Sequence, residues 1–263
     1  MEIEIVTLSR QGGRNYNEDV HGHWHDERYV ACLVADGAGG HGGGDVAAAT
    51  ARSSVLGGFS AAPALDEATL RRLIDQANRD VVARQAEGGK LAAMRSTVVL
   101  VAIDLHDNQF AWAHSGDSRA YLFREGALVT RTVDHSLVQQ MVAGGMLDEE
   151  GARLHPQRNM LLSALGSLDE PPEITVSAAM PLAAGDVLLL CSDGVWEPLG
   201  DECLSDTLQA SRNPGQWIEQ LDQQIKARAK PGHDNYTALV IWLRADEDET
   251  RLMTPATEEP VAN

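Results

Sequence analysis

The chain has 263 residues, of which 43% are hydrophobic, so it is long enough to form one large domain with a sizeable core. Its 39 acidic residues outnumber its 21 Lys and Arg, which gives a formal net charge of −18 without any marked basic cluster. This balance argues against nucleic acid or an anionic membrane surface as a partner, because both attract basic patches.

Three cysteines, Cys32, Cys191 and Cys203, form no CxxC pair, and the first two lie in apolar segments typical of buried strands. A disulfide or a zinc site is therefore not expected, and a reducing compartment is favoured. The first ten residues lack the apolar region of a signal peptide, and no apolar run reaches the ~18 residues that a membrane span needs. We expect a cytoplasmic protein without a membrane partner.

Seven segments are predicted to be strands, because they are rich in Val, Ile, Leu or aromatic residues and are bounded by Gly, Asp or Asn. They are residues 3–8, 29–35, 97–105, 109–115, 120–124, 187–192 and 236–243. Asp107-Asn108 and Glu125-Gly126 are typical of tight turns between neighbouring strands. Strands joined by hairpins favour antiparallel sheets.

Three long helices are predicted at residues 44–56, 66–86 and 214–229, the second with Asp66 as its N-cap. Two sheets with helices on their outer faces would bury all of these apolar surfaces. His21, His23 and His25 alternate along one short stretch, and a solvated hairpin tip is favoured there over a metal-binding tract.

From residue 134 to 167 the strand series is interrupted by two predicted short helices, 136–143 and 148–155, which indicates an inserted flap. The domain is expected to span residues 1–244. Residues 245–263 carry six acidic residues against one Arg, with two prolines, and are predicted to be a disordered tail.

Carboxylates recur where apolar segments end. Asp36 follows the strand 29–35 and precedes Gly37, and the same order recurs at Asp193-Gly194. Further acids stand at Glu18, Asp19, Asp117 and Asp234. Converging carboxylates repel one another without a counter-charge, and Mg²⁺ and Mn²⁺ prefer oxygen ligands. The pattern therefore predicts a divalent-metal site.

Arg14 lies near the first of these acids, in an extended segment where Tyr16 and Glu18 would share its face. A guanidinium held beside a carboxylate cluster is a ready receptor for phosphate oxygens. The alternative is a surface ion pair between Arg14 and Glu18.

Five motifs in sequence order, spanning residues 14–237, carry a resemblance to a known family. They are Arg14-x-x-Asn17-Glu18-Asp19, Val34-Ala35-Asp36-Gly37-x-Gly39-Gly40-His41, Gly116-Asp117-Ser118-Arg119, Ser192-Asp193-Gly194 and Asp234-Asn235-x-Thr237. In these motifs the chain resembles the bacterial PP2C-type (PPM) metal-dependent Ser/Thr protein phosphatases. The resemblance implies an α+β fold, a four-layer α/β/β/α sandwich of two antiparallel sheets flanked by helices.

The resemblance also implies a site with two Mn²⁺ or Mg²⁺ ions and a weaker third. Asp36 would bridge both ions and the Gly37 carbonyl would hold the first. Asp193 and Asp234 would hold the second ion, Asp117 with Asp193 the third, and Glu18 and Asp19 would contribute directly or through water. Arg14 would clamp the substrate phosphate.

The leaving alkoxide of such a reaction needs a proton. The eukaryotic relatives have a His directly after the Asp-Gly pair, where this chain has Ala38. His41 is the nearest candidate acid; a structural role in the glycine turn, or metal-bound water as the proton source, remains an alternative.

The function expected from this resemblance is hydrolysis of phosphoserine and phosphothreonine on proteins, in opposition to a bacterial Ser/Thr kinase. One alternative is an inactive phosphatase fold that binds phosphoproteins, although every expected carboxylate is present. Another is a phosphatase restricted to anti-sigma-antagonist proteins. The flap sequence is similar to those of housekeeping phosphatases and of phosphatases serving type VI secretion.

Overall fold

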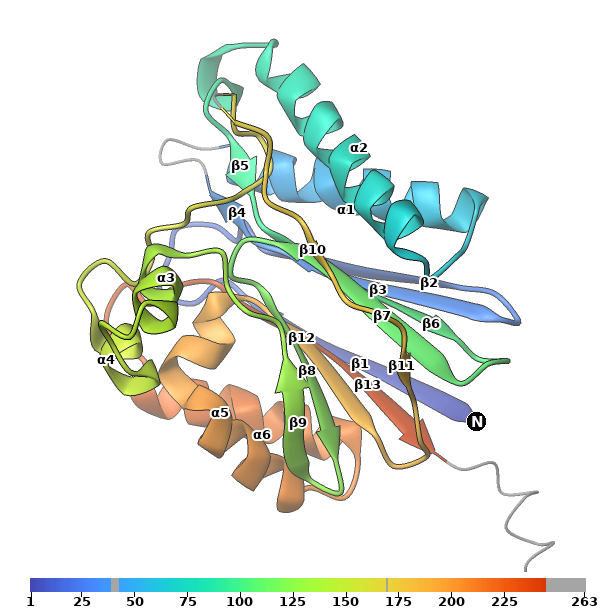
Figure 1. The fold of residues 1–263 in the computed structure, drawn as a ribbon. Coiled ribbons are helices and arrows are strands. Elements are labelled where there is room, and N and C mark those ends of the chain that lie inside the picture. Colours follow the sequence, from blue (N-terminus) through green and yellow to red (C-terminus); the bar gives the residue numbers. More distant parts are fainter. Residues whose placement is uncertain (39–42, 169, 245–263) are drawn as a thin grey trace, which may run out of the picture.

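The computed structural model describes residues 1–38, 43–168 and 170–244. Over these residues the strands form two antiparallel sheets that pack face to face. One has the order β1-β13-β12-β8-β9, and the other the order β10-β7-β6-β3-β2, with β11 also paired to β7. The short strands β4 and β5 pair with each other (Figure 1).

The strands of the first sheet have the following bounds: β1 Glu2–Arg10, β8 Arg119–Arg124, β9 Ala127–Arg131, β12 Val187–Cys191 and β13 Tyr236–Arg244. Those of the second sheet are β2 Val20–His25, β3 Tyr29–Ala35, β6 Val98–Asp104, β7 Gln109–Ser115, β10 Thr175–Val176 and β11 Met180–Pro181. The small pair is β4 Gly37–Ala38 with β5 Arg95–Ser96.

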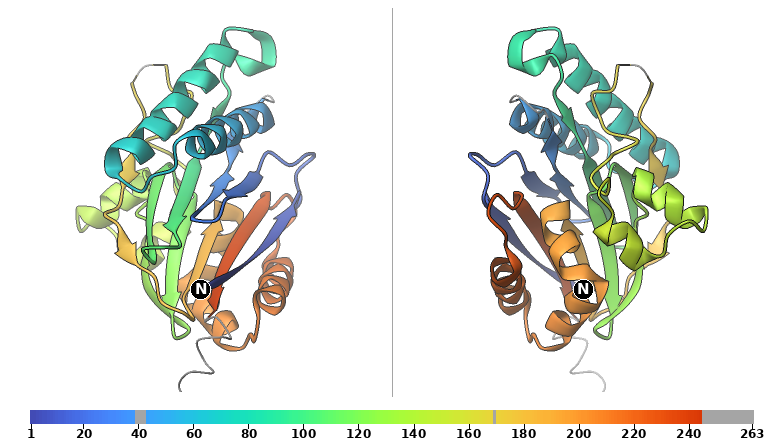
Figure 2. Two further views of the ribbon diagram at one scale, coloured as in Figure 1. Left: turned by 90° about the vertical axis from the view of Figure 1, so that its right-hand side faces the viewer. Right: turned by 90° about the vertical axis from the view of Figure 1, so that its left-hand side faces the viewer.

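Helices cover both outer faces of the sandwich, as Figure 2 shows from two sides. Helices α1 (Gly44–Ala61) and α2 (Glu67–Gln85) lie on the β2–β3–β6–β7 sheet, and the 3₁₀ turn Gly89–Leu91 follows them. Helices α5 (Asp193–Gln209) and α6 (Pro214–Arg228) lie on the other sheet. Between β9 and β10 the chain forms α3 (Leu137–Ala143) and α4 (Glu149–Leu154).

Alternation along β3 shows how one strand serves two cores. Ala31, Leu33 and Ala35 pack under α1 and α2, whereas Val30, Cys32 and Val34 pack between the sheets. Successive side chains of a strand point to opposite faces, so a central strand in this four-layer arrangement must be apolar on both. Cys32 and Cys191 are therefore buried free thiols, as expected.

The predicted α+β sandwich is confirmed; the strands β4, β5, β9, β10 and β11 were not predicted, and two further elements were misassigned. The His21–His25 stretch is no hairpin tip: it lies in β2, paired with β3 so that His23 is opposite Cys32. Helix α5 was not expected, since Pro198 and Gly200 lie inside it and Gly200 has non-helical backbone angles. The predicted tail, residues 245–263, lies outside the described residues.

Among the described helices, none combines the length and the apolar character required to cross a bilayer.

Candidate active site

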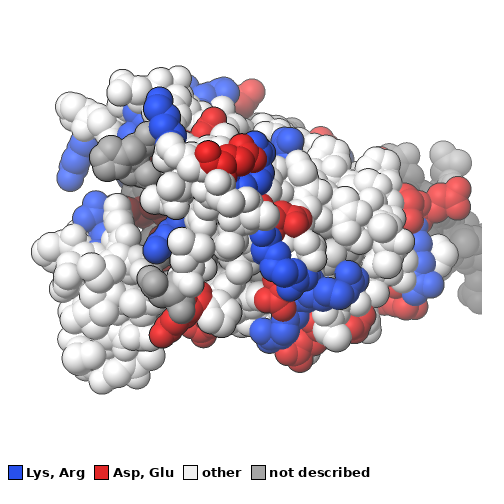
Figure 3. Space-filling model, turned by 90° about the horizontal axis from the view of Figure 1, so that it is seen from above, with Lys and Arg blue, Asp and Glu red and all other residues white. Residues whose placement is uncertain are grey.

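Five carboxylate side chains line one cavity of about 370 Å³ at the edge of the sandwich. Each comes from the end of a different element: Asp36 follows β3, Asp117 the turn after β7, Asp193 opens α5, Asp234 precedes β13, and Glu18 precedes β2. The predicted acids are thus brought together, with Arg14 and Gly37 in the same lining. We call this cavity the acidic pocket. Figure 3, seen from the side of α2, shows a hollow between two lobes with acidic atoms inside it.

The backbone around Asp36 is fixed by hydroxyl groups of the next strand. The Thr97 hydroxyl accepts from the Asp36 N–H at 3.0 Å, and the Thr97 N–H donates to the Asp36 carbonyl at 2.8 Å. Thr97 Oγ1 in turn lies 2.7 Å from the Ser118 hydroxyl, beside Asp117. These hydrogen bonds connect the backbone of Asp36 to Ser118, the residue after Asp117.

Asp19 lies deeper and is 6% exposed. Its carboxylate accepts from the Ser192 hydroxyl at 2.7 Å, and Ser192 Oγ also accepts from the Thr237 N–H at 3.0 Å. Ser192 is the residue before Asp193, so these contacts tie the start of α5 to the segment that follows β1.

Asn235 also lines the acidic pocket and connects two segments around it. Its side-chain amide donates to the carbonyl oxygens of Gln11 and Tyr16 at 2.7 and 3.0 Å, and its Oδ1 accepts from the Glu18 N–H at 2.9 Å. A Cβ at Gly194 would lie only 2.0 Å from the Asn235 carbonyl oxygen. Glycine is therefore required after Asp193 for α5 to approach the Asp234 loop.

Burial and mutual repulsion raise the pKa of most of these carboxyls. Desolvation, followed by repulsion from Asp19, Asp193 and other acids, holds the pKa of Asp36 well above its usual range, and the same causes act on Asp193. Desolvation raises the pKa of Asp19 to about 6 and that of Asp117 to about 7, and it also raises that of Glu18. Among the described lining residues, the five carboxylates of the pocket thus outnumber the one cation, Arg14.

Three buried carboxylate oxygens have no hydrogen-bond donor: Glu18 Oε1, Asp19 Oδ1 and Asp193 Oδ1. A buried acceptor without a partner is costly, and hard divalent cations satisfy such oxygens. In the described part of the chain no three His, Cys, Asp or Glu side chains are arranged so that they could hold a metal ion by themselves, so water or carbonyl oxygens would have to complete the ligands. Mg²⁺ is commonly held by one or two carboxylates and water, so the donor set fits such an ion.

Arg14 does not pair with Glu18; its guanidinium binds Asp234, with Nη2 2.6 Å from Oδ2. Its side chain is 53% exposed at the mouth of the pocket. The guanidinium can therefore contact an anion in the pocket without leaving Asp234.

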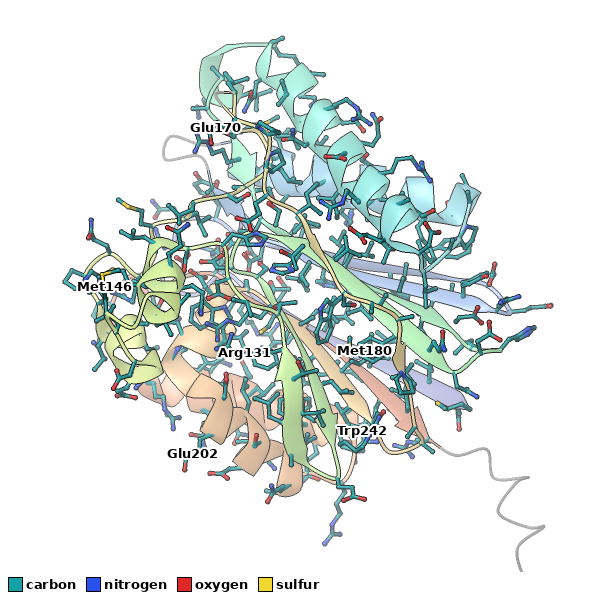
Figure 4. The ribbon with its side chains drawn as sticks, in the orientation of Figure 1. Arg131, Met146, Glu170, Met180, Glu202 and Trp242 are labelled. Atoms are coloured by element: carbon teal, nitrogen blue, oxygen red, sulfur yellow. The ribbon has the colours of Figure 1, made fainter. Side chains whose placement is uncertain are left out.

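Arg119 is buried and connects the pocket to the residues 134–167, here called the flap. It forms two hydrogen bonds of 2.8 and 2.7 Å to Asp134, and its guanidinium carbon lies 3.5 Å from the centre of a Trp196 ring. The Trp196 indole N–H donates to the Asp117 carbonyl at 2.9 Å. Met146, at the far end of the flap, points away from the body and is 67% exposed (Figure 4).

Replacing Arg119 by Ala should destabilise the protein by about 3 kcal/mol, because the change leaves Asp134 buried without its partner. Urea unfolding measures this loss. Arg119→Lys retains the charge but not the paired geometry, and its loss should be smaller. A loss below ~1 kcal/mol for Arg119→Ala would contradict this role of the ion pair.

Of the predicted site residues, His41 lies outside the described residues, as do Gly39 and Gly40. Near the pocket, His135 stacks on His114 with ring centres 4.6 Å apart, and its Nδ1 accepts from the Gly116 N–H at 3.3 Å. The supporting roles of Thr97, Ser118 and Asn235 were not anticipated. Ser118 and Asn235 are adjacent to Asp117 and Asp234 in the motifs, and this adjacency could have indicated their roles. No sequence motif includes Thr97.

The chain is similar to known protein phosphatases in sequence and in fold. A family model described as protein phosphatase 2C matches residues 9–244. The chain is 34% identical over 235 residues to serine/threonine phosphatase stp of Listeria welshimeri, covering 87% of this chain and 90% of that protein.

Two solved structures are also similar. One is the catalytic domain of the serine threonine protein phosphatase PstP in complex with two manganese ions, with 30% identity, a TM-score of 0.74 and coverage of 92% of this chain and 99% of that one. The other is PppA of Pseudomonas aeruginosa, described as a key regulatory component of T6SS. It has 30% identity, a TM-score of 0.72 and coverage of 92% and 98%.

Proposed function

The chain belongs to the protein phosphatase 2C family, and from this premise we propose that its acidic pocket is the place where phosphoserine and phosphothreonine are hydrolysed. The chain is a protein Ser/Thr phosphatase with a divalent-metal requirement, and phosphoproteins are its substrates. The observation that supports this location of the active site is that five carboxylates and Arg14 line one cavity.

The ligands we propose for two Mn²⁺ or Mg²⁺ ions are Asp36, the Gly37 carbonyl, Asp193 and Asp234. Glu18 and Asp19 would contribute directly or through water, and Asp117 with Asp193 would hold a weaker third ion. When bound, such ions mask the charge of a phosphomonoester and lower the pKa of a water so that it can attack near neutral pH.

Arg14 binds the phosphoryl oxygens in this proposal and stabilises charge on them during in-line attack. Its contact with Asp234 orients the guanidinium toward the pocket. No histidine lines the described part of the pocket. We propose that the leaving alkoxide takes its proton from water or from His41.

The experiment that tests this function is turnover of a phosphothreonine peptide with Mn²⁺ or Mg²⁺, with and without EDTA. Turnover should require the ion and return when it is restored, and comparing the two ions shows which supports the faster reaction. Full activity in EDTA would refute the metal-dependent site, and no turnover with either ion would favour the inactive phosphoprotein-binding alternative.

Arg14→Ala should raise KM for an aryl phosphate about tenfold and change kcat less, because a charge-assisted hydrogen bond to the substrate is lost. Steady-state kinetics at saturating Mn²⁺ measure the effect. Arg10→Ala is the matched control, since Arg10 is also 53% exposed but does not line the pocket. An unchanged KM in Arg14→Ala would show that Arg14 does not bind the substrate phosphate.

We further propose that a Ser/Thr kinase opposes this phosphatase, in the cytoplasm, where the free thiols Cys32 and Cys191 would stay reduced. Two settings are considered: general Ser/Thr signalling, and regulation of T6SS, as described for PppA. Phosphoproteomics of a deletion strain distinguishes them by the proteins whose phosphorylation rises.

A further inference from the structure

A second groove, of about 570 Å³, continues from the acidic pocket and shares Arg14, Asn159, Asp193 and Asp234 with it. One wall consists of α4 and the residues after it, with Arg153 and Arg158; the other consists of the end of α6 and the following loop, with Arg228 and Lys230. We call this the basic groove, defined by Arg153, Arg158, Arg228 and Lys230.

The charges in this groove are not all neutralised. Arg158 pairs with Glu197, and Arg153 lies 3.1 Å from Glu150. Within the described residues, neither Arg228 nor Lys230 has a carboxylate partner; Arg228 donates to Gln224 instead. Two exposed cations without a carboxylate partner are therefore left beside the pocket of a protein whose net charge is −18.

The loop that carries Lys230 is hydrogen-bonded to the segment that carries Arg14. The His233 N–H donates to the Lys230 carbonyl at 3.0 Å, and the Gly13 N–H donates to the His233 carbonyl at 2.9 Å. Gly13 is adjacent to Arg14, so the groove wall and the phosphate-binding residue belong to one hydrogen-bonded unit. The position of Lys230 relative to the pocket is thus fixed by backbone contacts.

We propose that the basic groove binds anionic side chains next to the phosphorylated residue of the substrate. The proposal rests on the function proposed above: with the phosphoryl group in the acidic pocket, an extended chain advances about 3.3 Å per residue along the contiguous groove. Arg228 and Lys230 then meet carboxylates or a second phosphoryl group. The substrate class is a phosphopeptide with an acidic flank.

The test compares three phosphothreonine peptides, with neutral flanks, with Asp/Glu flanks and with a second phosphoserine. The variant is Arg228→Gln/Lys230→Gln, and the matched control is Arg72→Gln/Arg79→Gln on α2, which changes the net charge equally. For the variant, kcat/KM on both anionic peptides should fall about three- to tenfold, as expected for two exposed ion pairs. Hydrolysis of the neutral peptide and of an aryl phosphate should not change.

For the wild type, the preference for the anionic peptides should weaken as salt rises. Equal kcat/KM for neutral and anionic peptides, or equal losses in the groove variant and the α2 control, would overturn the proposal. A response to the diphosphorylated peptide alone would identify phosphoryl groups rather than carboxylates as the ligand. Fluorescence anisotropy of the same labelled peptides reports binding independently of turnover, so failure of the hydrolytic site and failure of the groove give different results.

Discussion

Asp36→Asn should lower kcat about a thousandfold in saturating Mn²⁺, with the fold intact. Asp36 stands at the centre of the acidic pocket, where Asp19, Asp193, Asp117 and Asp234 all act on its charge. Loss of a residue that only supports a metal ligand costs about 10–100-fold, so loss of a central ligand should cost more. Initial rates with an aryl phosphate over a range of Mn²⁺ concentrations measure the effect.

The same substitution should stabilise the metal-free protein, because one like charge is removed from a buried cluster. Thermal unfolding without metal should therefore give a higher Tm than the wild type, while added Mn²⁺ should stabilise the variant less than the wild type. Asp75→Asn on α2 is the control and should change neither quantity. Turnover of Asp36→Asn at the wild-type rate would contradict the assignment of the site.

The residues of the site could be predicted because their signals are local. A carboxylate between an apolar strand and a glycine identifies Asp36 and Asp193 without any knowledge of what lies nearby in space. The contacts that hold them could not be predicted in this way. Asn235 binds the carbonyls of Gln11 and Tyr16 across more than 200 residues of sequence, and no local pattern specifies such a pairing.

The two misassigned elements also have physical reasons. Strand β2 contains three His and a Gly, with Val20 as its one β-branched residue, and its pairing with β3 determines its conformation. Helix α5 contains Pro198 and Gly200, which normally end a helix, but its buried side chains Val195, Trp196 and Leu199 pack on the sheet. In β2 tertiary packing outweighs local preference, whereas in α5 Gly200 keeps non-helical angles and kinks the helix, with helical turns on both sides of it.

The metal-free protein should lose stability as pH rises from about 4 to 7. Asp19 and Asp117 have folded-state pKa values of about 6 and about 7, both above the ordinary 3.8. The folded protein therefore binds more protons than the unfolded chain in this window, and its stability falls as these protons leave. Together the two groups correspond to a loss on the order of 7 kcal/mol, which is complete about one pH unit above the pKa of Asp117. Below about pH 4 both carboxyls are protonated in the folded and in the unfolded state. The two states then bind equally many protons, and stability no longer changes with pH through these groups.

Saturating Mn²⁺ should reverse this trend, because the ion favours the ionised carboxylates and binds more tightly as they deprotonate. Urea unfolding at pH 5, 6, 7 and 8, with EDTA and with Mn²⁺, separates the two behaviours. Asp117→Asn should make the metal-free curve less steep between pH 4 and 6, where both carboxyls contribute, and flatten it most between pH 6 and 7, where Asp19 no longer contributes. If the stability of the metal-free protein is constant or rises from pH 5 to 7, the pKa values of Asp19 and Asp117 are not raised in the folded state and this prediction is wrong.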